Sequence, residues 1–290
     1  MKTAIIINPH AGRKRALKQW EKLERELQKH EYVFDTFFTN GRMHAVAIME
    51  EIKNEYEKII VVSGDGTFNE VLQNFLPEKN ILGLVGCGTG NDLLRSLETK
   101  NDIKSTAKRI MNAKIREIDL WQANGRIFAN GAGIGFDAEV VDDINRKGRT
   151  LFPKLDYFAS IFHVLFSFKP TRVEINVDGA LFTDEIMLCL SGNGRFIGGG
   201  MKIAPAAELD DQLLYICIVK AISTLRFLKE YPSIFSGNHV NKTKFVKVLI
   251  GKSVKISTAT PMHIQADGEA LGITPLEISL CPYKLKILID

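Results

Sequence analysis

From Ala4 to Leu120 the sequence alternates short apolar runs, typical of buried strands, with segments of helical periodicity. We expect strands at 4–8, 32–38, 58–63, 81–85 and 115–120. We expect helices at 13–30, 44–54, 68–76 and 104–112. Because strands that alternate with helices of this length form a parallel sheet covered by helices, this region predicts an α/β domain.

After Leu120 the pattern changes to short strand candidates separated by turn residues. They lie at 126–130, 172–177, 185–190, 213–219, 244–250, 254–257, 263–266, 276–280 and 285–289. Two helices interrupt them, at 137–145 and 224–235. This pattern predicts a second, β-rich domain with an antiparallel, sandwich-like sheet.

Composition excludes several classes of protein. The chain is 45% hydrophobic and 25% charged, which is typical of a globular protein. Its net charge of +4 is a smaller positive excess than nucleic-acid-binding proteins usually have. No apolar run reaches the length of a transmembrane helix, and the N-terminal residues lack a signal-peptide pattern. The cysteines show no C-x-x-C pair, which favours free thiols in a reducing, cytoplasmic setting; they are Cys87, Cys189, Cys217 and Cys281.

Two glycine-rich loops follow expected strands, Ser63-Gly64-Asp65-Gly66-Thr67 and Gly86-Cys87-Gly88-Thr89-Gly90-Asn91. The carboxyl ends of parallel strands meet at one edge of a sheet, so both loops should lie near each other. Glycine lets main-chain N–H groups approach phosphate oxygens, and a following helix N-terminus favours the anion. The alternative is that strand-to-helix turns simply require glycine, with Thr67, Asn91 or Asp92 as a helix cap. Neither loop is a P-loop or a G-x-G-x-x-G motif.

The first loop, followed by Asn69-Glu70-Val71, resembles the nucleotide-binding signature of the diacylglycerol kinase catalytic domain family. That family includes soluble bacterial lipid kinases and is related to the sphingosine and ceramide kinases, with NAD kinases more distant. Further family landmarks occur in order along nearly the whole chain: Asn8-Pro9, Gly12, Gly88 to Asp92, Asp119, Asn130-Gly131, Gly133 to Ala138, Gly198-Gly199-Gly200-Met201, Ala204-Pro205, Asp210-Asp211 and Asp267-Gly268-Glu269.

The resemblance implies an ATP-dependent lipid kinase that converts diacylglycerol to phosphatidic acid, with ATP and Mg²⁺ as cofactors. It implies that residues 1–123 form the nucleotide-binding domain, with 285–290 returning to it, and that residues 124–284 form the lipid-substrate domain. The residues implied to hold ATP and its magnesium are Asn8, Gly64, Asp65, Gly66, Thr67, Gly88, Thr89, Asn91, Asp92 and Asp119.

The resemblance also implies that Glu269 is the general base that takes the lipid hydroxyl proton, with Asp267 beside it. In addition, it implies a structural magnesium site made by Asp211 with the carbonyl groups of Glu208 and Leu213. Asp267-Gly268 has a second interpretation as a plain hairpin turn, and we assign no catalytic role to the similar Asp178-Gly179. An NAD kinase-like enzyme and a non-catalytic nucleotide or lipid sensor are the competing hypotheses.

Four positions depart from the family pattern. Ser63 replaces the first glycine of Gly-Gly-Asp-Gly-Thr, as in sphingosine kinases. Gly86 stands in place of a usual proline, so we expect a looser loop. Gln212 replaces a glycine whose backbone freedom it lacks, and Tyr215 replaces a common acidic residue. We therefore expect the magnesium site around Asp211 to be weak or absent.

A basic and apolar stretch suits an anionic membrane surface. It comprises Arg146-Lys147-Gly148-Arg149, Leu151-Phe152-Pro153-Lys154 and the aromatic-rich segment 157–166. We expect a lipid substrate at the membrane surface, peripheral association with the inner face of the membrane and no nucleic-acid partner, and we leave a homodimer open. The alternative is a solvated loop that leads into a core helix.

Overall fold

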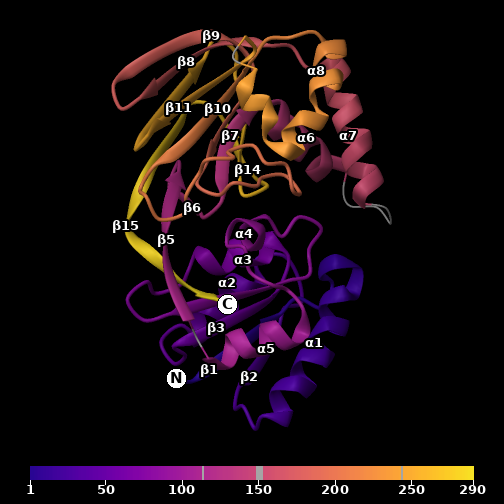
Figure 1. The fold of residues 1–290 in the computed structure, drawn as a ribbon, viewed down its shortest axis with the longest axis vertical. Helices are drawn as coiled ribbons and strands as arrows, with labels where there is room; N and C mark the ends of the chain where they lie inside the picture. Colours follow the sequence, from indigo (N-terminus) through magenta and orange to yellow (C-terminus); the bar gives the residue numbers. More distant parts are fainter. Residues whose placement is uncertain (113, 148–152, 243) are drawn as a thin grey trace. The chain divides into compact units, whose positions relative to one another are not determined.

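The computed structural model describes residues 1–290 except 113, 148–152 and 243, and the chain forms two compact units (Figure 1). Unit 1 comprises Met1–Leu120 with Cys281–Asp290, and unit 2 comprises Trp121–Leu280. Strands β5 (Lys114–Ala123) and β15 (Leu276–Ile289) each contribute residues to both units.

Unit 1 contains a parallel sheet in the order β2 (Asp35–Phe38), β1 (Thr3–Ile7), β3 (Lys58–Ser63) and β4 (Ile81–Gly86). The far end of β15 adds to this sheet in parallel, with Ile287 opposite Leu82 of β4. The helices are α1 (Ala11–Lys29), α2 (His44–Ile52), α3 (Asp65–Leu72), α4 (Asp92–Ser96) and α5 (Ile103–Asn112). Each strand of β1, β3 and β4 is buried along its length, because helices cover both faces of such a sheet.

Helix α1 shows how sequence pattern becomes packing in unit 1. Its buried residues, Ala16, Trp20, Leu23 and Leu27, recur at spacings of three and four and so form one apolar face. That face joins Ile5 and Ile7 of β1 in one hydrophobic cluster. The packing fixes the carboxyl end of β1 relative to the helix that follows it.

Unit 2 is built on antiparallel strands in the order β14 (Glu269–Ile273), β13 (His263–Ala266), β7 (Gly131–Gly135), β9 (Ala180–Gly192), β8 (Thr171–Val177) and β12 (Ser253–Thr258), followed by the first part of β15. Strand β10 (Leu214–Lys220) pairs with β9 and β11 (Val246–Gly251), and β6 (Arg126–Phe128) pairs with β5. The helical segments are α6 (Phe136–Lys147), α7 (Pro153–Ser167), α8 (Thr224–Glu230), α9 (Pro232–Ser236) and the 3₁₀ helix η1 (Asn238–Asn241). The predicted fold class, α/β followed by an antiparallel β-rich region, is confirmed.

Several element predictions need correction. The strands predicted at 276–280 and 285–289 are one strand, β15, whose first part pairs with β12 and whose far end pairs with β4. The helix predicted at 224–235 is two helices, because Pro232 cannot donate a helical hydrogen bond and begins α9. Strand β7 was missed because its glycine-rich sequence lacks a strand pattern. A Cβ at Gly133 would lie 2.3 Å from the carbonyl oxygen of Cys189, so the neighbouring strand requires glycine there.

The proposed membrane stretch is partly described. Arg149 lies outside the described residues, and of Lys147 and Lys154 only the backbone is described. In α7, Ile161, Val164 and Leu165 are buried in a core, which supports the core-helix alternative for that part of the segment. Across the described ranges, no helix combines the length and the apolar character needed to cross a membrane.

Candidate active site

The two glycine loops of unit 1 touch through their main chains. A Cβ added to Gly88 would lie 2.9 Å from the Cα of Gly64, so neither loop has room for a side chain at the contact. The N–H of Cys87 donates to the carbonyl oxygen of Ser63 at 2.7 Å. The loops after β3 and β4 therefore lie together, as the parallel strand order predicts.

Asp65 joins these two loops through its side chain. Its Oδ2 accepts the main-chain N–H of Asn91 at 2.9 Å, and Oδ1 of Asn91 accepts the N–H of Gly88 at 3.0 Å. Asn91 has a left-handed backbone with φ of 51°, which asparagine tolerates better than most residues. Asp65 is also in the first turn of α3, where the helix dipole favours a negative charge.

Asn8 connects the end of β1 to the same place. Its Nδ2 donates to Oγ1 of Thr67 at 2.9 Å, and its Oδ1 accepts the N–H of His10 at 3.1 Å. Thr67 is buried, while Gly66 and Gly88 are partly exposed and Thr89 is exposed. The ends of β1, β3 and β4 thus bring polar side chains and exposed main chain to one edge of the sheet.

Two arginines contact the second loop, and sequence analysis missed both. Arg15 donates from Nε to the carbonyl of Gly12 at 3.0 Å and from Nη2 to that of Gly88 at 3.2 Å. Arg95 donates from Nε to the carbonyl of Gly90 at 3.0 Å. Both guanidinium groups add positive charge beside the loop, which suits a polyphosphate. In sequence, each arginine is indistinguishable from a solvated helix residue, so only the tertiary contacts reveal them.

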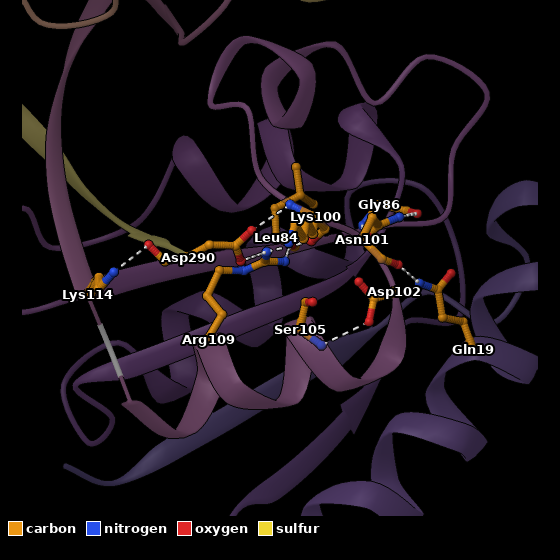
Figure 2. A network of polar contacts seen from close by, with 10 residues as sticks. All are labelled: Gln19, Leu84, Gly86, Lys100, Asn101, Asp102, Ser105, Arg109, Lys114 and Asp290. Carbon is orange, nitrogen blue, oxygen red and sulfur yellow. Dashed lines mark hydrogen bonds and ion pairs between the residues drawn. The ribbon is translucent and has the colours of Figure 1, made fainter.

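Gly86 does not loosen its loop, contrary to our expectation. The side chain of Asn101 binds both polar groups of the Gly86 main chain (Figure 2). The N–H of Gly86 donates to Oδ1 of Asn101 at 3.1 Å, and Nδ2 of Asn101 donates to the carbonyl of Gly86 at 2.6 Å. A Cβ at Gly86 would lie 2.7 Å from Cγ of Asn91. The side chain of Asn91 therefore occupies the space that a proline ring would need.

Further hydrogen bonds and an ion pair connect the segments on either side of this loop to the C-terminal residue (Figure 2). Arg109 is only 4% exposed and donates to the carboxylate of Asp290 at 2.8 Å and to the carbonyls of Lys100 at 2.7 Å and Leu84 at 3.2 Å. The main-chain N–H of Lys100 donates to Asp290 at 2.6 Å. These contacts connect strand β4, the segment before α5 and Asp290, the residue that follows β15.

Burial keeps the thiol within the second loop neutral. Cys87 is buried and donates from Sγ to Oε1 of Gln19 at 3.3 Å. Burial raises the pKa of this thiol to about 12. No thiolate charge therefore opposes an anionic ligand at this loop near neutral pH.

Two predicted acidic residues of unit 1, Asp92 and Asp119, are buried, and Asp119 lies in the middle of its strand. Asp92 begins α4, and its carbonyl accepts the hydroxyl of Ser96 at 3.0 Å. Asp119 lies on β5 and forms an ion pair with Lys284 of β15, at 2.9 Å between Oδ1 and Nζ. For Asp119 this pair compensates the burial of its charge.

In unit 2, Asp267 and Gly268 form the turn between β13 and β14, with Ala266 opposite Glu269. Their φ values of 47° and 81° fit a two-residue hairpin turn, so the hairpin prediction is confirmed. The carboxylate of Asp267 accepts three main-chain N–H groups, from Ala129 and Asn130 at 3.0 Å and from Gly131 at 2.9 Å. Asp267 thus holds the turn in place, while Glu269 is partly exposed at the start of β14.

The region implied to hold structural magnesium has a glycine-like backbone. Gln212 has φ of 59°, so it adopts the conformation that we expected it to resist. Oδ1 of Asp211 accepts the N–H of Leu213 at 2.9 Å, Glu208 is exposed, and Tyr215 is buried in β10. Among the described residues, no group of three or more His, Cys, Asp or Glu side chains has the arrangement of a metal site.

The two carboxylate oxygens of Asp137, in the first turn of α6, have different environments. Oδ2 accepts a hydrogen bond from Nε2 of Gln265 at 2.9 Å, whereas the buried Oδ1 has no hydrogen bond of ordinary geometry among the described residues. Burial raises the pKa of this carboxyl to about 7, and hydrogen bonds from Gln265 and from the main chain of Asp137 and Ala138 oppose that shift in part. The group therefore titrates near neutral pH.

This shift predicts a pH-dependent stability. Because the pKa of Asp137 in the folded protein lies above its ordinary value of 3.8, ionisation costs folding free energy as pH rises through about 7. Asp137→Asn removes the titration. The melting temperature of the wild type relative to this variant should fall between about pH 4 and about pH 7 and stay level above that. Thermal unfolding at several pH values checks this, and a constant difference would contradict it.

Comparison with known proteins agrees with this geometry. Residues 2–123 match the family model described as the diacylglycerol kinase catalytic domain, and residues 131–289 match the YegS C-terminal NAD kinase beta sandwich-like domain. The diacylglycerol kinase of Bacillus subtilis is 34% identical over 94% of this chain and 91% of its own length. That of Staphylococcus aureus is 30% identical over 93% of this chain and 87% of its own. A crystal structure of a diacylglycerol kinase from Bacillus anthracis is 24% identical, has a TM-score of 0.76, and the match covers 100% of this chain and 97% of that one.

Proposed function

Because this chain belongs to the diacylglycerol kinase catalytic domain family, we propose that it transfers the γ-phosphate of ATP to the hydroxyl of diacylglycerol, which gives phosphatidic acid. The observation that carries the proposal is the pair of glycine loops in unit 1, which touch at Gly64 and Gly88 and are joined by Asp65. Phosphoryl transfer needs positioning and charge neutralisation more than covalent chemistry, and such a cradle supplies both.

The residues at this edge fit a magnesium nucleotide. Gly64 and Gly88 have no side chains, so phosphate oxygens can closely approach the main-chain N–H groups of the two loops. The N-terminus of α3 favours the negative charge of those oxygens. Asp65 would help to hold Mg²⁺, which in such sites takes one or two carboxylates together with water and phosphate oxygens. Bound magnesium would neutralise charge on the transferred phosphoryl group.

The acceptor chemistry needs a base for one proton, and in unit 2 we assign that role to Glu269. Asp267 is committed to three main-chain N–H groups, so we assign it the role of holding the turn. Glu269 follows that turn directly and retains exposure. A carboxylate held by a rigid hairpin suits general base catalysis.

The direct test is a transfer assay with γ-labelled ATP against diacylglycerol, monoacylglycerol, phosphatidylglycerol, a long-chain base and a polyprenol in mixed micelles. We expect the label in phosphatidic acid. NAD is included as an acceptor, and label in that nucleotide would instead support an NAD kinase-like enzyme. ATP binding without transfer to any acceptor would support the sensor hypothesis.

We further propose that the protein binds the membrane surface peripherally through its basic stretch. Each basic residue near an anionic surface contributes about 1 kcal/mol, and salt screens this attraction. Replacing Arg146 and Lys154 by glutamine should weaken co-sedimentation with anionic vesicles at low salt by about tenfold or more. The control replaces two exposed lysines of α1, Lys18 and Lys22. Equal binding of wild type to neutral and anionic vesicles would contradict the proposal.

The structural magnesium site around Asp211 stays a prediction, and we expect it to be weak. Asp211 already accepts the N–H of Leu213, and Tyr215 supplies no carboxylate. Crystals soaked in manganese should show little anomalous signal at Asp211 at concentrations that saturate the nucleotide site. A fully occupied octahedral ion with oxygens at about 2.1 Å would contradict this prediction.

A further inference from the structure

The turn that carries Glu269 is held by the buried side chain of Gln265, and Gln265 in turn is held by Asp137, a partly exposed residue whose Oδ1 is buried. Gly268, between Asp267 and Glu269, donates its main-chain N–H to Oε1 of Gln265 at 3.1 Å. The other end of the same amide donates from Nε2 to Oδ2 of Asp137 at 2.9 Å. Gln265 is only 3% exposed, so its amide has little access to water as an alternative partner.

The orientation of the Gln265 amide follows from its neighbours. A main-chain N–H can only donate, so the atom facing Gly268 is the amide oxygen. The NH₂ group must then face Asp137, whose carboxylate is ionised above its pKa of about 7 and can then only accept. If the amide turned over, its NH₂ group would face the Gly268 N–H, and two donors would meet. The carboxylate of Asp137 therefore selects the orientation that holds the turn.

A second Asp-Gly hairpin in this chain provides an internal comparison. Between β8 and β9, Gly179 donates its N–H to Oδ1 of Asn176 at 2.8 Å, so an amide three residues before the glycine again accepts its N–H. Asn176 is partly exposed and lies in β8, just before a turn to which we assign no chemistry. A plain hairpin thus needs only the first hydrogen bond, and the contact of the amide with the Asp137 carboxylate is an added feature of the turn before Glu269.

That added feature carries a cost, which argues for a function. Oδ1 of Asp137 is buried without a hydrogen bond of ordinary geometry among the described residues, and the main-chain N–H groups of Asp137 and Ala138 offset the cost of its burial only in part. The raised pKa of Asp137 expresses the same cost. Helix α6 packs against β13, β14, β7, β9 and α7. The Asp137 carboxylate lies close enough to Cys189 of β9 to contribute to the raised pKa of that thiol, which burial raises most.

We propose that Asp137 and Gln265 are positioning residues that orient Glu269 for catalysis through the N–H of Gly268. The inference rests on the proposed function, because it gives Glu269 the role of general base. Fixing the turn limits the positions that the Glu269 carboxylate can reach. Neither Asp137 nor Gln265 needs to contact the substrate for this effect.

The test compares Asp137→Asn and Gln265→Met with the control Asn176→Ala. Asparagine has the shape of aspartate but can donate, so it permits the wrong orientation of Gln265. Methionine removes the amide altogether. Each of the two variants should lower kcat by about tenfold, since a small misplacement of a catalytic group is costly, while the KM and Kd for ATP stay unchanged. The control should keep wild-type kcat.

The decisive measurement repeats Asp137→Asn in a Glu269→Gln background. A positioning residue has nothing to position once the base is gone, so kcat should not fall further. An equal loss in both backgrounds would show general damage and overturn the inference. If Asp137→Asn does not fold, wild-type kcat in Gln265→Met overturns it instead. If Glu269→Gln loses turnover but Asp137→Asn keeps it, the positioning role is refuted and the general-base role of Glu269 stands. If Glu269→Gln keeps full turnover, both roles are refuted.

Discussion

Replacing Asp65 by asparagine should lower the rate of phosphoryl transfer by about a hundredfold or more while the fold stays intact. The side chain of Asp65 accepts the N–H of Asn91, and the amide oxygen of asparagine can accept the same hydrogen bond. The connection between the two loops is therefore preserved. The variant loses one negative charge, which is the property needed to hold Mg²⁺ beside the phosphates.

A matched control exists in the same unit. Asp102 also accepts a main-chain N–H, that of Ser105 at 3.0 Å, at the start of another helix. Asp102→Asn should keep wild-type turnover, so a loss confined to Asp65→Asn reflects the nucleotide site. Steady-state kinetics with circular dichroism of both purified variants make the measurement. Unchanged turnover in Asp65→Asn would refute the assignment of this edge as the nucleotide site.

Replacing Glu269 by glutamine should lower kcat by about 10²- to 10⁴-fold, the usual contribution of a general base. Glutamine keeps the shape of the side chain and removes its basicity. Because a general base acts on the acceptor hydroxyl and not on the nucleotide, we expect the Kd for ATP to stay nearly unchanged. The fold should also persist, because Asp267 and Gln265 hold the turn independently.

Isothermal calorimetry with ATP, together with lipid kinase assays, tests this second prediction. Glu277→Gln is the control, since Glu277 is an exposed glutamate of unit 2 whose partner is Lys255 on the surface. Loss of ATP binding along with activity would place Glu269 in the nucleotide site. Full activity would reduce Asp267-Gly268-Glu269 to a hairpin turn.

The sequence alone determined those features that depend on neighbouring residues. Apolar runs and helical spacing predicted the parallel sheet of unit 1, including β3 at its observed bounds, Lys58–Ser63. The Asp267-Gly268 pair predicted its hairpin, because a turn of this type depends on two residues with left-handed backbones. Parallel strand order was sufficient to place the two glycine loops together.

Only the tertiary structure decided which side chains complete the site. Arg15 and Gly88, Asn101 and Gly86, and Asp137 and Gln265 are distant in sequence, so no local pattern links them. Gly86 is an example. A glycine at this position suggests a looser loop, yet Asn101 accepts its N–H and the side chain of Asn91 packs against it. Local propensity sets the backbone of a turn, whereas the partners of its polar groups depend on which distant segments pack beside it.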